Sequence, residues 1–359
     1  MHIAIDGREL VGKPTGVGRY VTELLRAWSS SRLDDELSVV LPAEPASSLR
    51  ALGTRLRWVV EPAERAGTGW EQLRLRRALG RLSPDVLFAP AYTAPLLHRC
   101  PTAVLVHDVS FWAHPEWFPP REGLRRRWLT RASARRADAV LTVSDFSKAE
   151  IVRWLRVPAE RIILAPPGAP PRRGGYDSVR PPIVLYVGSL FNRRRIPELL
   201  AGFAHAVNRV PDARLVLIGD NRTSPRQDPR ALARNLGLES RVEWHAWVDD
   251  ATLDRWYAQA RVFAFLSDYE GFGMTPLEAM AHGVPAVVLD TPVSREVYGD
   301  AARRVPPEPA AIGEALATLL SDPAAHRALV DAGARALERF TWGRTADTVR
   351  ATLQRIAGR

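Results

Sequence analysis

The stretch Tyr269–Pro285 reads YEGFGMTPLEAMAHGVP and places a glycine-rich loop in front of a short helical segment. An apolar, strand-like run, Val262–Leu266, leads into the loop, and a second run, Ala286–Leu289, follows the helix. A strand, a glycine loop, a short helix and another strand form one unit of a doubly wound α/β fold, which binds its ligands at the loop edge of the sheet. We therefore expect an α/β protein with a ligand site at this stretch.

The helix after the loop has the sequence features of a helix start. Thr275 suits the N-cap, Pro276 suits the first helical position, and Glu278 lies three residues after the cap. The exposed N–H groups of a helix start attract anions. A capping box formed by Thr275 and Glu278 is the purely structural interpretation, but it leaves Glu270 unexplained, because the adjacent loop offers no cation.

This stretch resembles the signature of the family 4 retaining glycosyltransferases (glycosyl transferases group 1), particularly mannosyltransferases. The resemblance rests on the spacing of Glu270 and Glu278 around a Gly-Phe-Gly loop, and on Gly283 and Pro285 that follow. The resemblance implies a GT-B fold, with two Rossmann-like domains facing a cleft. It also implies that Glu270 contacts the donor sugar and Glu278 the nucleotide ribose. The diphosphate would be held by the loop, Gly271, Phe272, Gly273, Met274 and Thr275.

Length and composition agree with two cytoplasmic domains. A chain of 359 residues exceeds one ordinary domain, and its single cysteine, Cys100, allows no intramolecular disulfide. No apolar run approaches the ~20 residues that span a bilayer. Met1–Gly7 has the pattern of a strand and not of a signal peptide. We expect a cytoplasmic protein, with peripheral attachment at the inner face of the membrane as an option.

The net charge of +10 is concentrated in the first half, where residues 1–180 hold 28 basic and 19 acidic residues. A predicted helix carries seven of these arginines: Arg121, Arg125, Arg126, Arg127, Arg131, Arg135 and Arg136. Its apolar stripe is Leu124, Trp128, Leu129 and Ala132. The helix is either a core-packed helix with a solvated basic face or a contact for anionic lipid headgroups. We expect no nucleic-acid partner, because no recognised binding motif accompanies the charge.

The first domain, predicted as residues 1–172, offers a second set of candidates. His107 follows the predicted strand Thr102–Val106 and so lies at the ligand edge, although a structural histidine is the alternative. Gly16 and Gly18 begin a helix, and their spacing favours a turn with close helix–strand packing. The resemblance places this loop near the donor phosphate. The resemblance places His107 against the transferred sugar and implies acceptor contacts for Arg19, Tyr20, Asp108, Ser144 and Lys148.

The second domain, predicted as residues 183–341, follows a Pro/Gly-rich linker at 173–182. After the strand Ile183–Val187 come Gly188 and then Arg193 and Arg194, whose cations face the edge that holds the glycine loop. The family has Asn or Gly where Arg195 stands. The resemblance places Trp247 and Val248 under the nucleotide base and carries the terminal helix, residues 342–359, back to the first domain.

The chain contains no Asp-x-Asp pair, a common metal-holding motif of sugar transfer. Fixed cations at Arg193 and Arg194 are the alternative, so we expect no cofactor and no metal. By resemblance, the reaction is transfer with retention from a GDP-, UDP- or dTDP-linked sugar to a saccharide or lipid-linked acceptor, in polysaccharide or glycoconjugate biosynthesis. The other candidates are a nucleotide-sugar epimerase, a non-catalytic sugar-nucleotide or membrane-binding protein, and a nucleic-acid binder.

Overall fold

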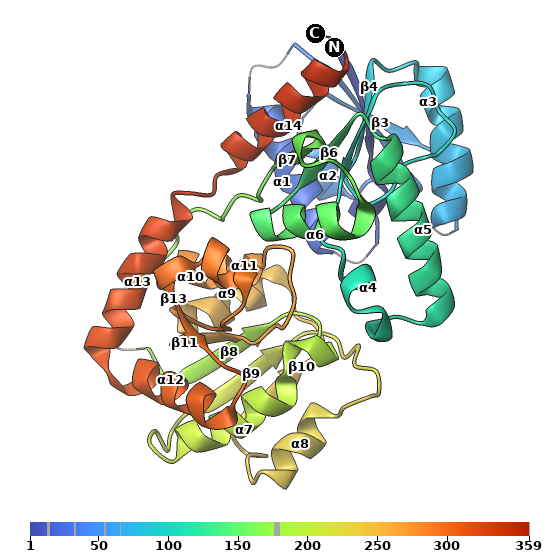
Figure 1. The fold of residues 1–359 in the computed structure, drawn as a ribbon. Helices are drawn as coiled ribbons and strands as arrows, with labels where there is room; N and C mark the ends of the chain where they lie inside the picture. Colours follow the sequence, from blue (N-terminus) through green and yellow to red (C-terminus); the bar gives the residue numbers. More distant parts are fainter. Residues whose placement is uncertain (13–14, 32–33, 54, 65, 176–179, 359) are drawn as a thin grey trace. The chain divides into compact units, whose positions relative to one another are not determined.

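The computed structural model describes residues 1–12, 15–31, 34–53, 55–64, 66–175 and 180–358. The chain forms two compact units, shown in Figure 1. Unit 1 contains residues 1–168 together with the C-terminal segment from Trp342, and unit 2 contains Ala169–Thr341. Of the predicted linker 173–182, residues 176–179 lie outside the described residues. Arg173 and Gly174 are part of unit 2, because their N–H groups donate to the carbonyl of Ala281.

Unit 1 is built on a parallel seven-stranded sheet with the strand order β3-β2-β1-β4-β5-β6-β7. From β1 the chain adds β2 and β3 on one side. It then returns to the other side of β1, where β4 to β7 follow in order, so the topological switch point lies between β1 and β4. The strands are β1 (His2–Asp6), β2 (Glu36–Leu41), β3 (Leu56–Val60), β4 (Val86–Ala89), β5 (Thr102–Leu105), β6 (Ala139–Thr142) and β7 (Ile162–Leu164).

Helices cover both faces of this sheet (Figure 1). The segments are α1 (Gly16–Ser30), α2 (Ser47–Arg50), η2 (Trp70–Leu75), α3 (Arg76–Leu82), α4 (Ser110–Ala113), α5 (Pro120–Arg136), α6 (Asp145–Leu155) and α14 (Trp342–Ile356). The terminal helix α14 returns to unit 1 as predicted, where Trp28 Nε1 donates to the carbonyl of Ala346 at 3.1 Å. Arg350 and Asp35 form a further ion pair at 2.6 Å between α14 and this unit.

Unit 2 repeats the design with a parallel six-stranded sheet in the order β10-β9-β8-β11-β12-β13. Its switch point lies between β8 and β11. The strands are β8 (Ile183–Val187), β9 (Arg214–Ile218), β10 (Val242–His245), β11 (Val262–Phe265), β12 (Ala286–Leu289) and β13 (Ala302–Val305). The helices are α7 (Ile196–Val207), α8 (Pro229–Asn235), α9 (Asp250–Gln259), α10 (Met274–Ala281), α11 (Pro292–Val297), α12 (Pro309–Ser321) and α13 (Pro323–Leu337).

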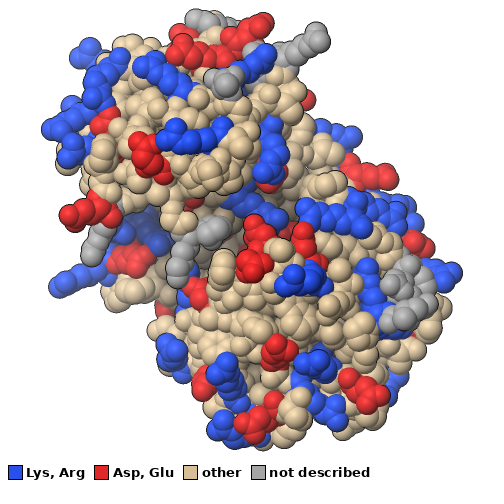
Figure 2. Space-filling view, turned by 180° about the vertical axis from the view of Figure 1, so that it is seen from behind, with Lys and Arg blue, Asp and Glu red and all other residues tan. Residues whose placement is uncertain are grey.

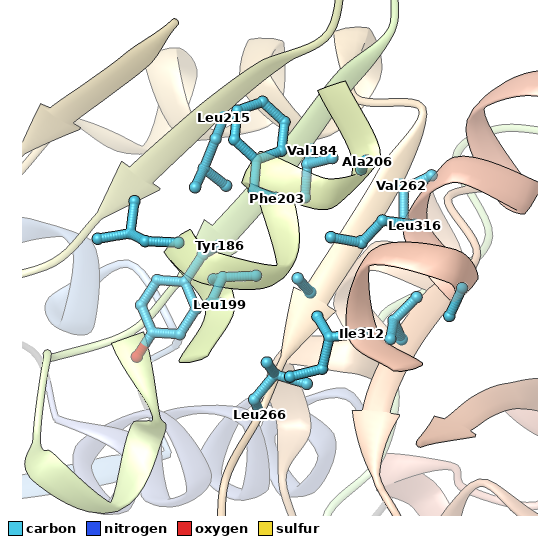
Figure 3. Close-up of a cluster of buried hydrophobic side chains, with 14 of the residues drawn as sticks. Val184, Tyr186, Leu199, Phe203, Ala206, Leu215, Val262, Leu266, Ile312 and Leu316 are labelled. Atoms are coloured by element: carbon cyan, nitrogen blue, oxygen red, sulfur yellow. The ribbon is translucent and has the colours of Figure 1, made fainter. Parts of the chain in front are cut away.

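The core of unit 2 depends on a close approach of α7 and α12 over the sheet. Phe203 and Leu199 from α7 meet Ile312 and Leu316 from α12 in one buried cluster (Figure 3). Glycine allows this approach, because a Cβ atom at Gly202 would lie 2.6 Å from Ile312 Cγ2.

We predict that Gly202→Ala destabilises the protein, although alanine is the better helix former. The added methyl group must displace the Ile312 side chain, so the free energy of unfolding should fall by about 1–3 kcal/mol. Gly80→Ala in α3 is the matched control. A Cβ atom there meets nothing within 4 Å, and the substitution should raise the free energy of unfolding by up to ~1 kcal/mol. Urea denaturation followed by circular dichroism measures both, and stabilisation by both substitutions would contradict the described packing.

Candidate active site

The glycine loop of unit 2 leads directly into α10, which begins at Met274, two residues before the predicted first helical position, Pro276. The N-cap is Gly273, with a φ of +86°, so the prediction that Thr275 caps the helix is wrong and no capping box forms with Glu278. Pro276 is tolerated in the first turn because N–H groups there have no partner within the helix. Tyr298 braces the loop by donating its hydroxyl hydrogen to the carbonyl of Gly273 at 2.7 Å. A Cβ atom at Gly273 would lie 2.2 Å from that hydroxyl, so only glycine fits.

The fold supplies Glu270 with the cation that its neighbours in sequence lack. Arg194 lies in the short helix η5 (Asn192–Arg194), and its Nη2 is 3.0 Å from Glu270 Oε1. The hydroxyl of Ser267 donates to the same oxygen at 2.6 Å, and Arg193 Nε lies 3.8 Å away. The arginines follow β8 and the glutamate follows β11, so these residues meet at the switch point of the sheet.

Arg195, the third arginine of the run, has a different role. It adopts a left-handed backbone with a φ of 52°, a conformation that Gly and Asn adopt more readily than Arg. Its side chain forms ion pairs with Asp268 at 2.8 Å and with Glu198 at 2.7 Å. The structure therefore assigns Arg193 and Arg194, and not Arg195, to Glu270.

The guanidinium of Arg194 is largely buried, and some of its hydrogen-bond donors are unused within the described part of the chain. Its side chain is only 12% exposed and lies over the ring of Phe265, at 4.3 Å from the guanidinium carbon to the ring centre. Its Nε and Nη1 have no hydrogen-bond partner among the described residues, and neither does the buried hydroxyl of Thr275 in the first turn of α10. Buried polar groups are nearly always hydrogen-bonded, so these unpaired donors point to an anion as the missing partner.

Glu278 is buried and held by two residues that the sequence analysis did not single out. The Tyr257 hydroxyl donates to Glu278 Oε2 at 3.1 Å. The Tyr257 ring stacks on His282, with centroids 4.9 Å apart, and His282 Nδ1 donates to the Glu278 carbonyl at 2.8 Å. No spacing rule links Tyr257, in α9, with Glu278, because only the packing of α9 and α10 brings them together.

The other candidates of unit 2 lie along the same edge of the sheet. Gly188 follows β8 with a φ of +145°, and Gly271 is buried in the loop. The Phe272 side chain packs edge-on against Phe340, so only its backbone can face a ligand. Trp247 is 74% exposed just beyond β10, and Val248 beside it is half-buried.

In unit 1, His107 lies at the carboxyl edge of the sheet between two tyrosine rings. The centroids of Tyr20 and Tyr92 are each 5.5 Å from that of His107. His107 Nε2 donates to the carbonyl of Pro90 at 2.9 Å, which leaves Nδ1 as the acceptor of the neutral ring. Burial lowers the pKa of His107, so the ring is neutral at neutral pH. Asp108 accepts from the Tyr92 hydroxyl at 3.1 Å.

Two of the acceptor candidates, Tyr20 and Ser144, make contacts within the protein around His107. Tyr20 is buried, and its hydroxyl donates to the carbonyl of Ala165 at 3.0 Å. Ser144 is the N-cap of α6, and its hydroxyl oxygen accepts from the N–H of Ser147. The Ser147 hydroxyl donates to the His107 carbonyl at 3.0 Å. Lys148 is half-buried in the same helical turn.

The two glycines in the first turn of α1 have different surroundings. Gly18 is structural, because a Cβ atom there would lie 2.3 Å from the carbonyl oxygen of Glu9. Gly16 is the first residue of α1, and a Cβ atom there would meet none of the described residues within 4 Å. Of these two glycines Gly16 is therefore the better placed for a ligand, with the exposed Arg19 in the same helical turn.

Sequence reasoning missed a buried ion cluster after β1. Arg8 pairs with Glu71 and lies 3.3 Å from Asp6, and its Nη2 donates to the carbonyl of Ala91 at 3.0 Å. It thereby fixes the segment that carries Pro90 and Tyr92, the two residues that hold His107. The only sequence signal was an Asp-Gly-Arg run at the end of the first predicted strand.

Among the described residues, no group of three or more His, Cys, Asp or Glu side chains is arranged to hold a metal ion. No described helix is long and apolar enough to cross a membrane.

Two family models match this chain. Residues 14–173 match "Glycosyltransferase Family 4" and residues 176–336 match "Glycosyl transferases group 1". O-antigen chain mannosyltransferase B of Escherichia coli is 27% identical over 358 residues, which cover 91% of this chain and 93% of the relative. D-inositol 3-phosphate glycosyltransferase of Xylanimonas cellulosilytica is 30% identical over 289 residues, 72% of this chain and 66% of the relative.

Solved structures show the same fold. Anabaena HepE, in complex with UDP and glucose, is 19% identical and superposes with a TM-score of 0.77 over 99% of both chains. Sucrose-phosphate synthase from Thermosynechococcus elongatus gives 0.78 at 19% identity, over 99% of this chain and 98% of its own. The fold class is GT-B, and the chain belongs to the family 4 glycosyltransferases.

We predict that Asp6 makes the stability of the protein depend on pH. Burial raises the pKa of Asp6 to about 6, so the folded chain holds this proton more tightly than the unfolded chain does. The stabilisation is complete below about pH 4 and is lost as the pH rises through 6, by about 3 kcal/mol for a shift of roughly two pKa units. Asp6→Asn removes the ionisation. Urea denaturation from pH 4 to 7 should show the free energy of unfolding of the wild type falling relative to that of the variant, and a constant difference would contradict the assignment.

Proposed function

We propose that the protein transfers a mannose-like hexose from a nucleotide sugar to a saccharide or lipid-linked saccharide acceptor, with retention and without a metal, in polysaccharide or glycoconjugate biosynthesis. The observation that carries the proposal is Arg194, a buried guanidinium with unpaired donors beside the glycine loop. In this proposal unit 2 binds the donor and unit 1 binds the acceptor.

Stabilisation of the leaving diphosphate is the main task of the donor site. Negative charge develops on the bridging oxygen as the bond to the sugar breaks, and fixed cations aimed at that charge lower the barrier. Arg193 and Arg194 supply these cations, and the first turn of α10 adds N–H groups and the positive end of the helix dipole. This chemistry supports metal-independent transfer, because the protein's own cations do what a metal ion would do.

Glu270 is suited to orient the donor sugar. Arg194 and Ser267 hold one carboxylate oxygen, Oε1, which leaves Oε2 to accept hydrogen bonds from sugar hydroxyls. Glu278, fixed by Tyr257, is assigned to the ribose hydroxyls. HepE, which was solved with UDP and glucose, supports a nucleoside-diphosphate donor, and the Escherichia coli mannosyltransferase supports a mannose-like sugar. The candidate donors are GDP-, UDP- and dTDP-linked sugars.

The proposed transfer proceeds on one face of the sugar. The bond from the anomeric carbon to the diphosphate oxygen breaks, the acceptor hydroxyl oxygen bonds to the same face, and its proton passes to the departing diphosphate. His107 suits the neighbourhood of an anomeric carbon that gains positive charge, because its neutral ring does not repel that charge and its Nδ1 can accept a hydrogen bond.

We predict that Glu270→Gln lowers turnover about 100-fold or more, because the sugar loses a charged hydrogen-bond acceptor that positions it for reaction. Glu239→Gln, at an exposed carboxylate of unit 2 paired with Arg234, is the matched control and should keep wild-type turnover. The assay offers GDP-mannose, UDP-glucose and dTDP-glucose in EDTA to alkyl-linked oligosaccharides and reads the anomeric configuration of the product by NMR.

Normal turnover of Glu270→Gln would overturn the role of this residue. Loss of wild-type activity in EDTA would overturn metal independence, and an inverted linkage would overturn retention. Isomerised donor sugar with no transfer to an acceptor would identify an epimerase instead.

A further inference from the structure

Helix α5 exposes apolar side chains that the sequence pattern had placed in one stripe with core residues. Leu129 is buried at 7% exposure, but Leu124 is 64% exposed and Trp128 is 61% exposed. The core contacts of α5 come instead mainly from small residues, such as Ser133 and Ala134, which are buried. Burial in the core therefore explains neither Leu124 nor Trp128.

Five exposed residues of α5 lie on one side of the helix, whereas Arg126, which is also exposed, lies off that side. Arg121, Leu124, Arg125, Trp128 and Arg135 are exposed, and their spacings of three, four and seven residues place them on one face. We call these five residues the outer face of α5. It alternates guanidinium groups with large apolar groups, which is the composition of a helix that lies in a membrane interface.

The arginines of the outer face carry uncompensated charge. Within α5, Glu122 pairs with Arg126 at 2.6 Å. Among the described residues, Arg121, Arg125 and Arg135 form no ion pair, and the side chain of Arg125 donates a hydrogen bond to the Thr68 hydroxyl at 3.3 Å. Their positive charge thus stays available to an anionic surface.

Residues 73–77, in η2 and α3, also combine exposed arginines with an exposed apolar side chain. Leu73 in η2 is 57% exposed, and Arg74, Arg76 and Arg77 are exposed beside it. The hydrogen bond between Arg125 and Thr68 joins α5 to the chain just before η2. In Figure 2, Lys and Arg side chains gather along the flank of unit 1 on which α3 and α5 lie.

We infer that the outer face of α5 docks unit 1 on an anionic bilayer surface. Trp128 and Leu124 enter the headgroup region, while the arginine side chains lie along the interface and direct their charge to lipid phosphates. A nucleic acid would use the charge but not Leu124, which has no base-stacking ring and no hydrogen-bonding group. The inference does not rest on the sugar or the reaction, so binding and transfer can fail separately.

Flotation of the full-length protein with lipid vesicles tests the inference. The vesicles contain phosphatidylcholine alone or with ~30% phosphatidylglycerol, at low and high salt. We expect binding only to the anionic vesicles and weaker binding at high salt. Arg121→Gln with Arg125→Gln should weaken binding about 25-fold, since one basic residue near the surface contributes roughly fivefold. Leu124→Ser with Trp128→Ser should weaken it ~10-fold or more at unchanged charge.

Matched controls separate the face from the total charge. Arg303→Gln with Arg335→Gln removes two exposed charges from unit 2, and Leu236→Ser removes an exposed leucine there. Both controls should bind within about twofold of the wild type if the outer face of α5 is the contact. Circular dichroism confirms that each variant is folded.

Three outcomes would overturn the inference. These are no binding of the wild type to anionic vesicles at low salt, equal losses in the α5 variants and in the controls, and undiminished binding of the Leu124/Trp128 variant. Salt-sensitive binding to heparin or DNA without vesicle binding would also overturn it and would point to a polyanion partner.

Discussion

The ion pair between Arg194 and Glu270 joins two loops that leave neighbouring strands, β8 and β11, on opposite sides of a switch point. Both charges are largely buried, and a buried charge is tolerated only when it is paired and hydrogen-bonded. Arg194 and Ser267 both hold Oε1 of Glu270, and Arg194 itself keeps two donors without a partner among the described residues. In the proposed function this pair leaves Glu270 Oε2 for a sugar and the unpaired donors of Arg194 for a phosphate. The strand order of unit 2 brings the two residues together.

Unit 1 also has an arginine just after its first strand, but this guanidinium is already paired with carboxylates of the protein. Arg8 follows β1 beside the switch point and engages Asp6, Glu71 and the carbonyl of Ala91. With two carboxylates on it, this guanidinium has little charge left for a ligand, and its effect is to shape the segment that holds His107. The two arginines therefore differ in the number of carboxylates that pair with them, which is two for Arg8 and one for Arg194.

Much of this arrangement could be predicted from the sequence. The alternation of strands and helices and the glycine loop indicated a doubly wound α/β fold, and the resemblance implied GT-B. The place of Arg193 and Arg194 after a predicted strand put them at the edge that holds the glycine loop, but the pairing of Arg194 with Glu270 was found only in the structure. What could not be predicted depends on packing between distant segments. Tyr257 and Tyr298 support the site from α9 and from the end of α11, and Gly273 starts α10 early because Tyr298 holds its carbonyl. The orientation of Trp128 was missed because its spacing fits both a core stripe and an exposed face.

The central claim is that Arg194 and the glycine loop bind the diphosphate of a nucleotide. Calorimetric titration in EDTA with GDP, UDP, dTDP and their monophosphates tests it, on the wild type, on Arg194→Gln and on Arg209→Gln, an exposed control in unit 2. One diphosphate should bind the wild type more tightly than its monophosphate does, and Arg194→Gln should weaken diphosphate binding about 10- to 100-fold, as expected for a charge-assisted contact, with the control unchanged. Equal affinity of Arg194→Gln and the wild type for that diphosphate would contradict the account.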